Sequence, residues 1–256
     1  MNKKIVMLCS DCFSTVTLYN YVSRYHSIDR VITEEPMRGM ALAKRRIKKM
    51  GFLKVAGQIM FSAAIVPLIR MRSRKRRKEI NEIYSFDETP VPLEKKVHFS
   101  TVNDEECIAL LQELNPDIVI VNGTRIISKK VLESTGAVFI NMHTGITPKY
   151  RGVHGGYWAV VNNDAENCGV TIHLVDKGID TGGILYQSVI PVTSKDNYYT
   201  YPFLQFGEGI PLIKKAVDDI AANTLTVVQS RTAESALWTH PTVWQYLYLR
   251  IVKGKK

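Results

Sequence analysis

Hydrophobic and polar positions along this chain fall into alternating blocks that predict strands and helices in turn. Short apolar runs rich in β-branched residues, typical of strands buried on both faces, occupy Lys4–Cys9, Ile28–Thr33 and Asp117–Val121. Between these runs, Thr15–Tyr25 and the segment after Asn103 have the spacing of helices. Strands that alternate with helices indicate an α/β fold, an open sheet with a parallel core.

A further apolar run, Ala137–Ile140, ends abruptly in polar residues. Asn141 and His143 follow it two positions apart. Side chains i and i+2 of a strand point to the same face, so a carboxamide and an imidazole project side by side there while Met142 points to the other face. Ligands of open α/β sheets bind at the carboxyl ends of the strands. This position therefore predicts a functional site.

The stretch Asp176–Gly183, DKGIDTGG, places a carboxylate, Asp180, in a glycine-rich turn. The turn joins two more predicted strands, Val170–Val175 and Ile184–Ile190, which should pair as an antiparallel hairpin because the link between them is short. We expect Asp180 to form one site with the carboxamide and the imidazole.

Further helices are predicted at Ser128–Ser134, His154–Asn163 and Ile210–Ala222. For the helix after Asn103 we predict a capping box, in which Asn103 caps the helix and Glu106 lies three residues on. As domains, we expect a catalytic core over residues 1–200 and a helical extension over 201–256 that packs on it.

Positive charge is concentrated in one stretch of the chain. The formal net charge is +10. Residues 37–78 hold fourteen Lys and Arg and no Asp or Glu, so subtracting 14 from 10 leaves −4 for the other residues. Residues 37–80 therefore predict a basic helical insertion, with an apolar segment, Gly51–Ile69, between two cationic runs.

Three interpretations of this insertion stay open. It is a solvated appendage without a function, a patch that attracts tRNA through phosphate charge, or an element that lies on an anionic membrane leaflet. The membrane interpretation is slightly favoured over nucleic acid. Lys54, Gln58, Ser62 and Pro67 interrupt the apolar segment, so a membrane-spanning helix is not expected.

The cysteine content and the amino-terminal residues indicate in which cellular compartment the protein lies. The four cysteines are too few for a disulfide scaffold, and the C-x-x-C of Cys9 and Cys12 lacks a second pair for zinc, so we expect no metal site. The first residues are interpreted as a strand rather than a signal peptide, because no long apolar segment with a cleavage site follows. We expect a cytoplasmic protein, associated with the membrane if the insertion is interfacial.

The three candidate side chains suit the transfer of a carbonyl-level group. Imidazole gives and takes a proton near neutral pH, a carboxamide N–H stabilises an oxyanion, and a carboxylate favours the imidazolium and orients the ring. No Ser or Cys stands in a nucleophile-elbow pattern. Direct attack by the substrate's own nucleophile is therefore the simpler mechanism.

The string INMHTGITPKYRG, followed by GVTIHLVDKGIDTGGILYQ, resembles the folate-dependent formyltransferase family. This family includes glycinamide ribonucleotide transformylase, methionyl-tRNA formyltransferase and the sugar N-formyltransferases. The match covers roughly residues 100–195. The resemblance implies a Rossmann-like formyltransferase fold, in which Asn141 and His143 polarise the formyl oxygen of 10-formyltetrahydrofolate and Asp180 assists His143 in proton transfer from an attacking amine.

The resemblance also implies contacts with the folate and with the acceptor. The implied folate-binding residues are Asn122, Gly123, Thr124, Arg125, Ile126, Ile127, Thr144, Gly145, Ile146, Thr147, Pro148, Asp176, Gly178 and Ile179. The family's loop is often S-L-L-P where this chain has Gly145–Pro148. Arg151 and His154 are candidate acceptor contacts, although Arg151 alternatively anchors the loop and His154 alternatively begins a helix.

The favoured acceptor is a primary amine on a nucleotide-linked amino sugar, by elimination. The purine enzyme has a glycine-rich phosphate loop after its first strand, whereas this chain has Ser10–Thr15 there, without glycine and with Asp11, which would repel a phosphate. The tRNA enzyme adds a barrel domain, for which the residues after Ile190 are too few. Both acceptors stay as alternatives, as do a folate-dependent deformylase and a membrane- or RNA-binding module with a vestigial folate site. The oligomeric state stays open.

Overall fold

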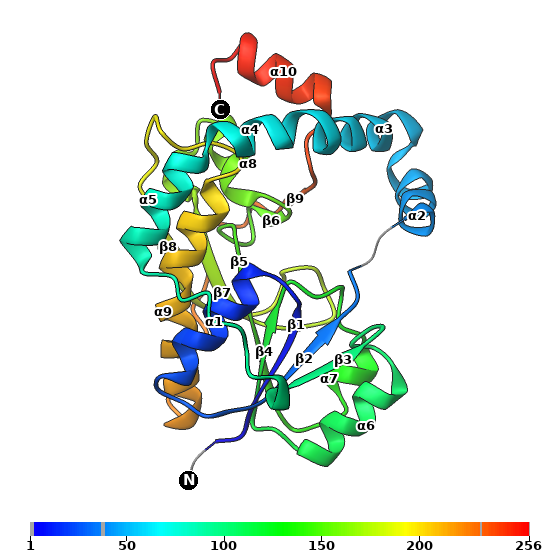
Figure 1. The fold of residues 1–256 in the computed structure, drawn as a ribbon, viewed down its shortest axis with the longest axis vertical. Helices are drawn as coiled ribbons and strands as arrows, with labels where there is room; N and C mark the ends of the chain where they lie inside the picture. Colours follow the sequence, from blue (N-terminus) through cyan, green and yellow to red (C-terminus); the bar gives the residue numbers. More distant parts are fainter. Residues whose placement is uncertain (1–2, 37–38, 231, 256) are drawn as a thin grey trace.

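A seven-stranded sheet runs through the computed structural model, which describes residues 3–36, 39–230 and 232–255 (Figure 1). Positions 37 and 38, the first of the expected insertion, lie outside the described residues. The strands are β1 (Ile5–Ser10), β2 (Ile28–Glu34), β3 (Lys96–Phe99), β4 (Ile118–Asn122), β5 (Val138–His143), β7 (Gly169–Leu174) and β8 (Ile184–Val189).

The order of the strands in the sheet is β3-β2-β1-β4-β5-β7-β8. The first five strands are parallel to one another, whereas β7 pairs antiparallel with both β5 and β8. The α/β class, the parallel core and the antiparallel hairpin are therefore confirmed. Two short strands, β6 (Arg151–Gly152) and β9 (Leu237–Trp238), form a separate parallel pair.

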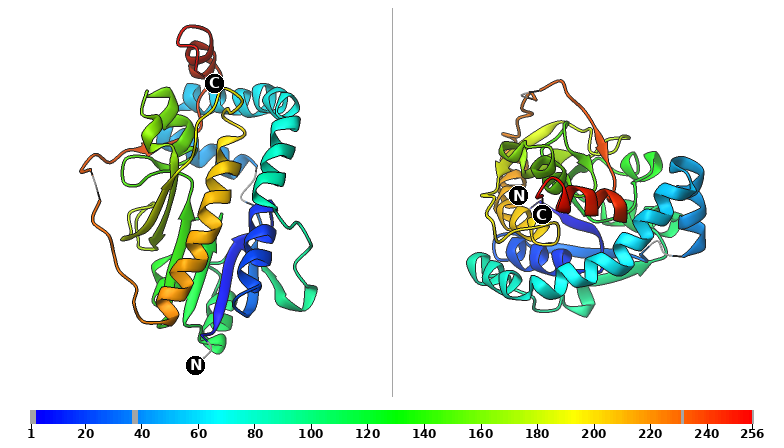
Figure 2. Two further views of the ribbon diagram at one scale, coloured as in Figure 1. Left: turned by 90° about the vertical axis from the view of Figure 1, so that its left-hand side faces the viewer. Right: turned by 90° about the horizontal axis from the view of Figure 1, so that it is seen from above.

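Helices cover both faces of the sheet and form a separate layer at one end of it (Figure 2). They are α1 (Phe13–Ser23), α2 (Met40–Met50), α3 (Phe52–Met60), α4 (Val66–Arg72), α5 (Arg74–Tyr84), α6 (Glu105–Leu114), α7 (Lys129–Leu132), α8 (Gly155–Val161), α9 (Tyr201–Ala221) and α10 (Val243–Ile251). A π-helical turn, Phe61–Ile65, joins α3 to α4, and the short 3-10 turns are Leu93–Lys95 and Ala165–Asn167. The basic insertion is thus helical, as expected.

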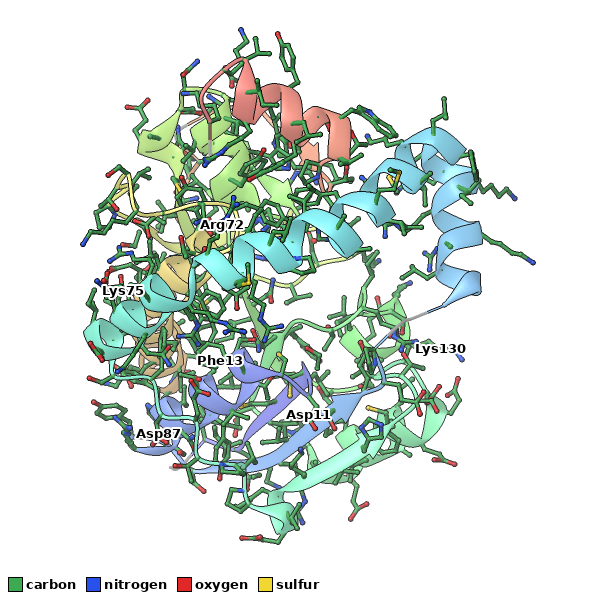
Figure 3. The ribbon with its side chains drawn as sticks, turned by 45° about the horizontal axis from the view of Figure 1, so that its top comes forward. Asp11, Phe13, Arg72, Lys75, Asp87 and Lys130 are labelled. Atoms are coloured by element: carbon green, nitrogen blue, oxygen red, sulfur yellow. The ribbon has the colours of Figure 1, made fainter. Side chains whose placement is uncertain are left out.

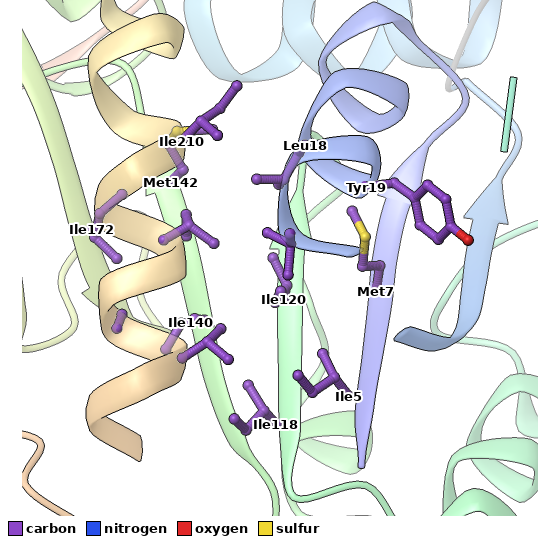
Figure 4. Close-up of a cluster of buried hydrophobic side chains, with 14 of the residues drawn as sticks. Ile5, Met7, Leu18, Tyr19, Ile118, Ile120, Ile140, Met142, Ile172 and Ile210 are labelled. Atoms are coloured by element: carbon purple, nitrogen blue, oxygen red, sulfur yellow. The ribbon is translucent and has the colours of Figure 1, made fainter. Parts of the chain in front are cut away.

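The central strands are buried on both faces, which explains their continuous apolar runs. Along β1, Ile5 and Met7 belong to a core beneath α1 and α9, whereas Val6 and Leu8 belong to a core beneath α6 and α7. Figure 4 shows the first of these cores, where the side chains of neighbouring parallel strands line up against Leu18 of α1.

Helix α9 is part of this central packing. Its buried residues include Ile213 and Val217, which join the same core as β1 and β4. The helix begins at Tyr201, nine residues before the start predicted at Ile210. Pro202 lies in its first turn, where the missing N–H has no intrahelical partner to lose. The expected division after residue 200 therefore falls immediately before a helix that the sheet packs against.

The predicted capping box after Asn103 is wrong. Helix α6 begins at Glu105, with Asp104 at the N-cap and no side-chain capping bond. The Asn103 side chain instead donates to the Ile126 carbonyl (3.1 Å) and accepts from the Ser128 N–H (2.7 Å). The Asn103 side chain bonds to these two backbone groups of a distant loop and not to the first turn of its own helix. The spacing of residues in the sequence does not reveal such a partner.

The central core makes a first prediction about stability. The Ile120 side chain is 0% exposed between α1 and the neighbouring strands. Ile120→Ala should lower the free energy of unfolding by about 2–5 kcal/mol, because it removes buried methylenes and leaves a cavity. Urea denaturation measures the change. The matched control is Ile83→Ala, at a residue 62% exposed on α5, where a change within about 0.5 kcal/mol is expected. Equal losses in the two variants would contradict this packing.

Candidate active site

Strand β5 brings the two predicted polar side chains to its carboxyl end, as the alternation required. Asn141 is the register partner of His173, and His143 is the register partner of Thr171, both on β7. Met142 lies between them and points to the opposite face, into the core beneath α9 (Figure 4).

The imidazole of His143 is buried, with 6% of its area exposed, and its tautomer follows from its contacts. Nε2 lies 2.7 Å from the Tyr150 carbonyl oxygen. A carbonyl only accepts hydrogen bonds, so Nε2 carries the hydrogen and donates it. The other nitrogen, Nδ1, is then the one that gains and loses a proton, and it lies 3.4 Å from Oδ2 of Asp180.

Asp180 is held in place by backbone groups of its surroundings. Its backbone has a left-handed conformation (φ 52°), and its Oδ2 accepts a hydrogen bond from the Gly152 N–H (2.9 Å). The Arg151 guanidinium donates to the neighbouring Ile179 carbonyl (2.9 Å), which braces the turn. The three predicted catalytic side chains are therefore brought together, although Asp180 is about forty residues from the other two in sequence.

A second imidazole, that of His173, also lies in the site. Its Nδ1–H donates to the Leu174 carbonyl (2.7 Å), so its Nε2 accepts from the Asn141 carboxamide nitrogen (3.1 Å). The same Nε2 lies 3.7 Å from Oδ1 of Asp180. The sequence pattern did not place His173 in the site. The signal it missed is the antiparallel register, which sets His173 opposite Asn141.

Burial and charge act in opposite directions on this cluster. Burial lowers the pKa of His143 below its usual range, although the negative charge of Asp180 and the bond to Tyr150 oppose it. Burial alone would raise the pKa of Asp180, but the contacts with His173, His143 and the Gly152 N–H outweigh burial and hold that pKa below its usual range. Near neutral pH the pair is therefore a neutral imidazole beside a carboxylate.

These side chains line a cavity of about 580 Å³, a size that accepts a small organic molecule. Many of the residues expected to bind folate line the same cavity. They are Gly123, Thr124, Arg125, Ile126, Ile127, Thr144, Asp176, Gly178 and Ile179. The lining combines apolar side chains such as Ile126, Ile127 and Leu237 with polar and ionisable groups, which suits a partly polar ring system. The residues present fit a folate.

Other predicted residues lie behind the wall of the cavity. Asn122 is buried and donates to the hydroxyls of Ser14 and Thr15. The loop Gly145–Pro148 supports the site from outside, since the Thr171 hydroxyl donates to the Gly145 carbonyl (2.7 Å) and accepts from the Thr147 N–H (3.1 Å).

Neither candidate acceptor contact lines the cavity. Arg151 is engaged by Ile179 and by the Ser235 hydroxyl (3.0 Å). His154 packs against the Tyr198 ring, with 4.0 Å between ring centroids, and its Nδ1 is buried. Each of them therefore holds neighbouring segments together.

Two segments that the sequence did not connect to the site complete its wall. Lys49, Met50 and Lys54 enter from the basic insertion, and Leu237–Thr239 enters from the chain after α9. The second segment is positioned by β9, whose Trp238 pairs with Gly152 next to the loop that follows β5. Periodicity describes single elements, so it does not reveal that two helices of the insertion and a short strand near the end of the chain meet at this cavity.

Comparisons with known proteins identify the family of the chain and support the fold. A family model described as formyl transferase matches residues 63–202, more than half of the chain. The methionyl-tRNA formyltransferase of Finegoldia magna is 37% identical over 119 residues, and that of Nitratiruptor sp. is 39% identical over 102 residues. The chain belongs to the formyl transferase family, which confirms the resemblance.

The alignments cover only part of each relative. The first spans 46% of this chain and 38% of the Finegoldia protein, and the second spans 40% of this chain and 33% of the Nitratiruptor protein. The chain thus matches less than half of the length of these curated relatives.

Solved structures share the fold at low sequence identity. Glycinamide ribonucleotide transformylase 1 from Symbiobacterium toebii has a TM-score of 0.58 at 16% identity, covering 93% of this chain and 94% of that one. The N-formyltransferase from Helicobacter canadensis, in complex with folinic acid and dTDP-3-aminofucose, has a TM-score of 0.56 at 19% identity, covering 92% and 70%. The formyltransferase fold is therefore confirmed.

Burial of His154 predicts a pH dependence of stability. Burial, and then the nearby His240, lower the pKa of His154 to about 3. Below about pH 6.5 the unfolded chain gains a proton at this position that the folded chain does not, so stability falls as pH falls. His154→Asn, which tolerates the left-handed backbone (φ 57°), should remove on the order of 2 kcal/mol of the decline between pH 6.5 and pH 5.

Chemical denaturation at pH 8, 6.5 and 5 measures this effect. The pH 8 value of each protein serves as its own reference, so that any loss of packing in the variant cancels. Parallel pH profiles for the variant and the original protein would contradict the assignment.

Proposed function

We propose that this protein transfers a formyl group from 10-formyltetrahydrofolate to a primary amine, with a nucleotide-linked amino sugar as the favoured acceptor. The observation that carries the proposal is the convergence of the Asn141 carboxamide, Nδ1 of His143 and the Asp180 carboxylate on one cavity. Family membership and the fit of a folate to the cavity wall support the choice of donor.

Each side chain has a distinct task in this reaction. The bound folate supplies the formyl carbon and, through its N10, the leaving group. The Asn141 carboxamide bonds to His173 through one N–H (3.1 Å), which leaves its second N–H to donate to the oxygen that becomes negative during attack. His143 accepts the proton of the attacking amine at Nδ1 and then returns it to the leaving nitrogen.

Asp180 acts on the charge that His143 gains. At 3.4 Å its carboxylate stabilises the imidazolium that forms when Nδ1 takes the proton. The bond between Nε2–H and the Tyr150 carbonyl holds the ring so that Nδ1 keeps facing the cavity. The bond between the amine nitrogen and the formyl carbon would form first, and the bond between that carbon and N10 would break as the oxyanion collapses. One proton moves from the amine to the folate nitrogen.

The remaining wall of the cavity supports an anionic acceptor. With folate assigned to Gly123–Ile127, Thr144, Asp176, Gly178 and Ile179, the rest of the cavity lining includes Leu237–Thr239 and two cations, Lys49 and Lys54. Two lysines suit the phosphates of a nucleotide-linked sugar.

The end of β1 argues against a ribonucleotide acceptor. Asp11 stands there, paired with Lys96 at 3.0 Å. The turn Ser10–Thr15 has no glycine, and its acidic side chain offers no donor to the phosphate of glycinamide ribonucleotide.

An acceptor panel tests the proposed reaction. Purified protein and 10-formyltetrahydrofolate are incubated with amino-sugar nucleotides, glycinamide ribonucleotide, methionyl-tRNA or no amine, and products are read by mass spectrometry. We expect formyl incorporation into an amino-sugar nucleotide. Incorporation only into tRNA or the ribonucleotide would overturn the acceptor, and rapid formate release without amine would identify a hydrolase instead. Failure to bind a folate analogue in calorimetry would contradict the whole proposal.

Removal of either proton-handling side chain should slow turnover. His143→Ala or Asp180→Ala should lower kcat by at least about a hundredfold, the scale of lost acid–base catalysis. In Asp180→Asn the acid limb of the pH–rate profile should move to lower pH, because the carboxylate that raises the pKa of His143 is gone. Steady-state kinetics across pH measures both effects. Unchanged turnover in either alanine variant would refute the proton-transfer roles of these two side chains.

A further inference from the structure

One helix of this protein is unusually apolar for its exposure. Helix α3, the π-helical turn and α4 form one continuous helix, Phe52–Arg72, of 21 residues, and its most apolar window of 18 residues has a mean hydropathy of 1.8. By length and composition it could cross a membrane, yet only 28% of its most apolar window is buried in the protein. Such an exposed apolar surface requires an explanation.

The inner side of this helix is bound firmly to the rest of the protein, which argues against spanning. Gln58 is 1% exposed and bonds to Arg46 (2.7 Å), to the Thr239 hydroxyl (3.1 Å) and to the His240 carbonyl (2.6 Å). Phe61 is fully buried beneath α10, packed on Tyr246 with 5.0 Å between ring centroids. The helix therefore lies flat along the surface of the molecule (Figure 1).

The outer side of the helix is apolar and exposed, and α10 extends it. Helix α10 presents Trp244, Leu247, Tyr248 and Ile251, whose i, i+3, i+4 and i+7 spacing makes one exposed stripe. We name the combined surface the apolar platform. Its residues are Phe52, Leu53, Ile59, Met60, Leu68, Met71, Trp244, Leu247, Tyr248 and Ile251.

The two halves of the apolar platform are in direct contact. A Cβ at Gly57 would lie 2.3 Å from the Trp244 ring, so this glycine lets the indole of α10 lie against α3. Leu53 and Met60, four residues before and three after Gly57, share its side of the helix. Seen from above, α10 lies beside the helix Phe52–Arg72 (Figure 2).

Cations border the apolar platform at both ends, and acidic residues are absent from its segments. Arg70, Arg72, Arg74 and Lys75 are exposed at the α4–α5 end, where Figure 3 labels Arg72 and Lys75. Within the described part of the chain these four form no ion pair with a carboxylate. Lys44, Arg45 and Lys48 are exposed on α2 at the other end, and Arg250 and Lys253 follow the stripe on α10. Residues 37–78 and 243–256 contain no Asp or Glu.

We propose that the apolar platform docks onto an anionic lipid bilayer and lies in its interface. Apolar side chains flanked by cations match the acyl boundary and the anionic headgroups, and Trp244 and Tyr248 are the ring types that prefer this depth. A second copy of the chain is a poor partner for the platform, because the positive charges that border the two copies of this surface would repel each other. Nucleic acid would contact the cations through its phosphates but would leave the apolar side chains between them exposed to water.

Vesicle binding tests this proposal independently of the formyl transfer reaction. Full-length protein is co-sedimented with vesicles of phosphatidylcholine alone and with phosphatidylcholine mixed with phosphatidylglycerol. We expect binding to the anionic vesicles that weakens as salt rises and that is at least about tenfold weaker to the neutral ones. The double variant Leu53→Glu/Ile251→Glu changes residues that are 75% and 76% exposed in the protein. Its binding to anionic vesicles should be at least about tenfold weaker, because two aliphatic side chains that enter the bilayer are removed.

A matched control separates the platform from general surface charge. Leu93→Glu changes an 84% exposed leucine in the turn before β3, outside the platform, and should bind like the original protein. Circular dichroism and folate-analogue binding verify that each variant folds. Arg70→Gln/Arg74→Gln should weaken binding to anionic vesicles and flatten its salt dependence.

Three results would overturn the proposal. The first is absence of binding to anionic vesicles by the folded protein, and the second is equal binding by the double variant. The third is a dimer in light scattering, or a tRNA complex, that the double variant abolishes while vesicle binding stays unaffected. That result would assign the platform to a second copy or to nucleic acid.

Discussion

The hydrogen bond from Nε2 of His143 to the Tyr150 carbonyl is the interaction on which the site depends. It joins the end of β5 to the end of the loop that follows, and it fixes which ring nitrogen is free. The loop approaches closely enough only because Gly145 lacks a side chain. A Cβ there would lie 2.2 Å from the Tyr150 oxygen and 2.7 Å from Nε2. The loop is in turn fixed to β7 by the Thr171 hydroxyl.

This arrangement lets one buried site hold a neutral base beside a charged group. Burial disfavours an imidazolium at His143, while backbone and ring contacts keep Asp180 ionised. The base is therefore free to take a proton, and the carboxylate stabilises the charge only when it appears. His173 completes the arrangement, because it orients the Asn141 carboxamide with one nitrogen and faces Asp180 at 3.7 Å. A structural role and a role in the site coincide in this ring.

Local pattern was sufficient for much of the fold. The apolar runs predicted β1, β2, β4, β7 and β8 within one residue at each end, and they predicted the position of β5, although that strand continues to His143. The central strands gave this clear signal because they are buried on both faces. The N-x-H spacing predicted the shared face of Asn141 and His143 for the same reason. The predictions that failed concern side chains whose partners are distant in the sequence. Asn103 bonds to a loop rather than to its own helix, and His173 enters the site through strand register.

The same limit applies to the cavity wall and to the outer surface. Lys49 and Lys54 reach the cavity together with Leu237–Thr239, although nearly two hundred residues separate the two segments. The basic insertion was visible from composition, but its partnership with α10 was not, because it depends on the fit of one indole against Gly57. Periodicity describes single elements, whereas these features arise between elements.

The protonation state of His143 offers the sharpest test of this arrangement. In ¹⁵N NMR spectra of the protein with labelled histidine, we expect Nε2 of His143 to carry the hydrogen at neutral pH. We also expect Nδ1 to titrate with a pKa below the ordinary 6.5. A neutral ring protonated at Nδ1, or a pKa above 6.5, would contradict the geometry from which the proposed chemistry follows.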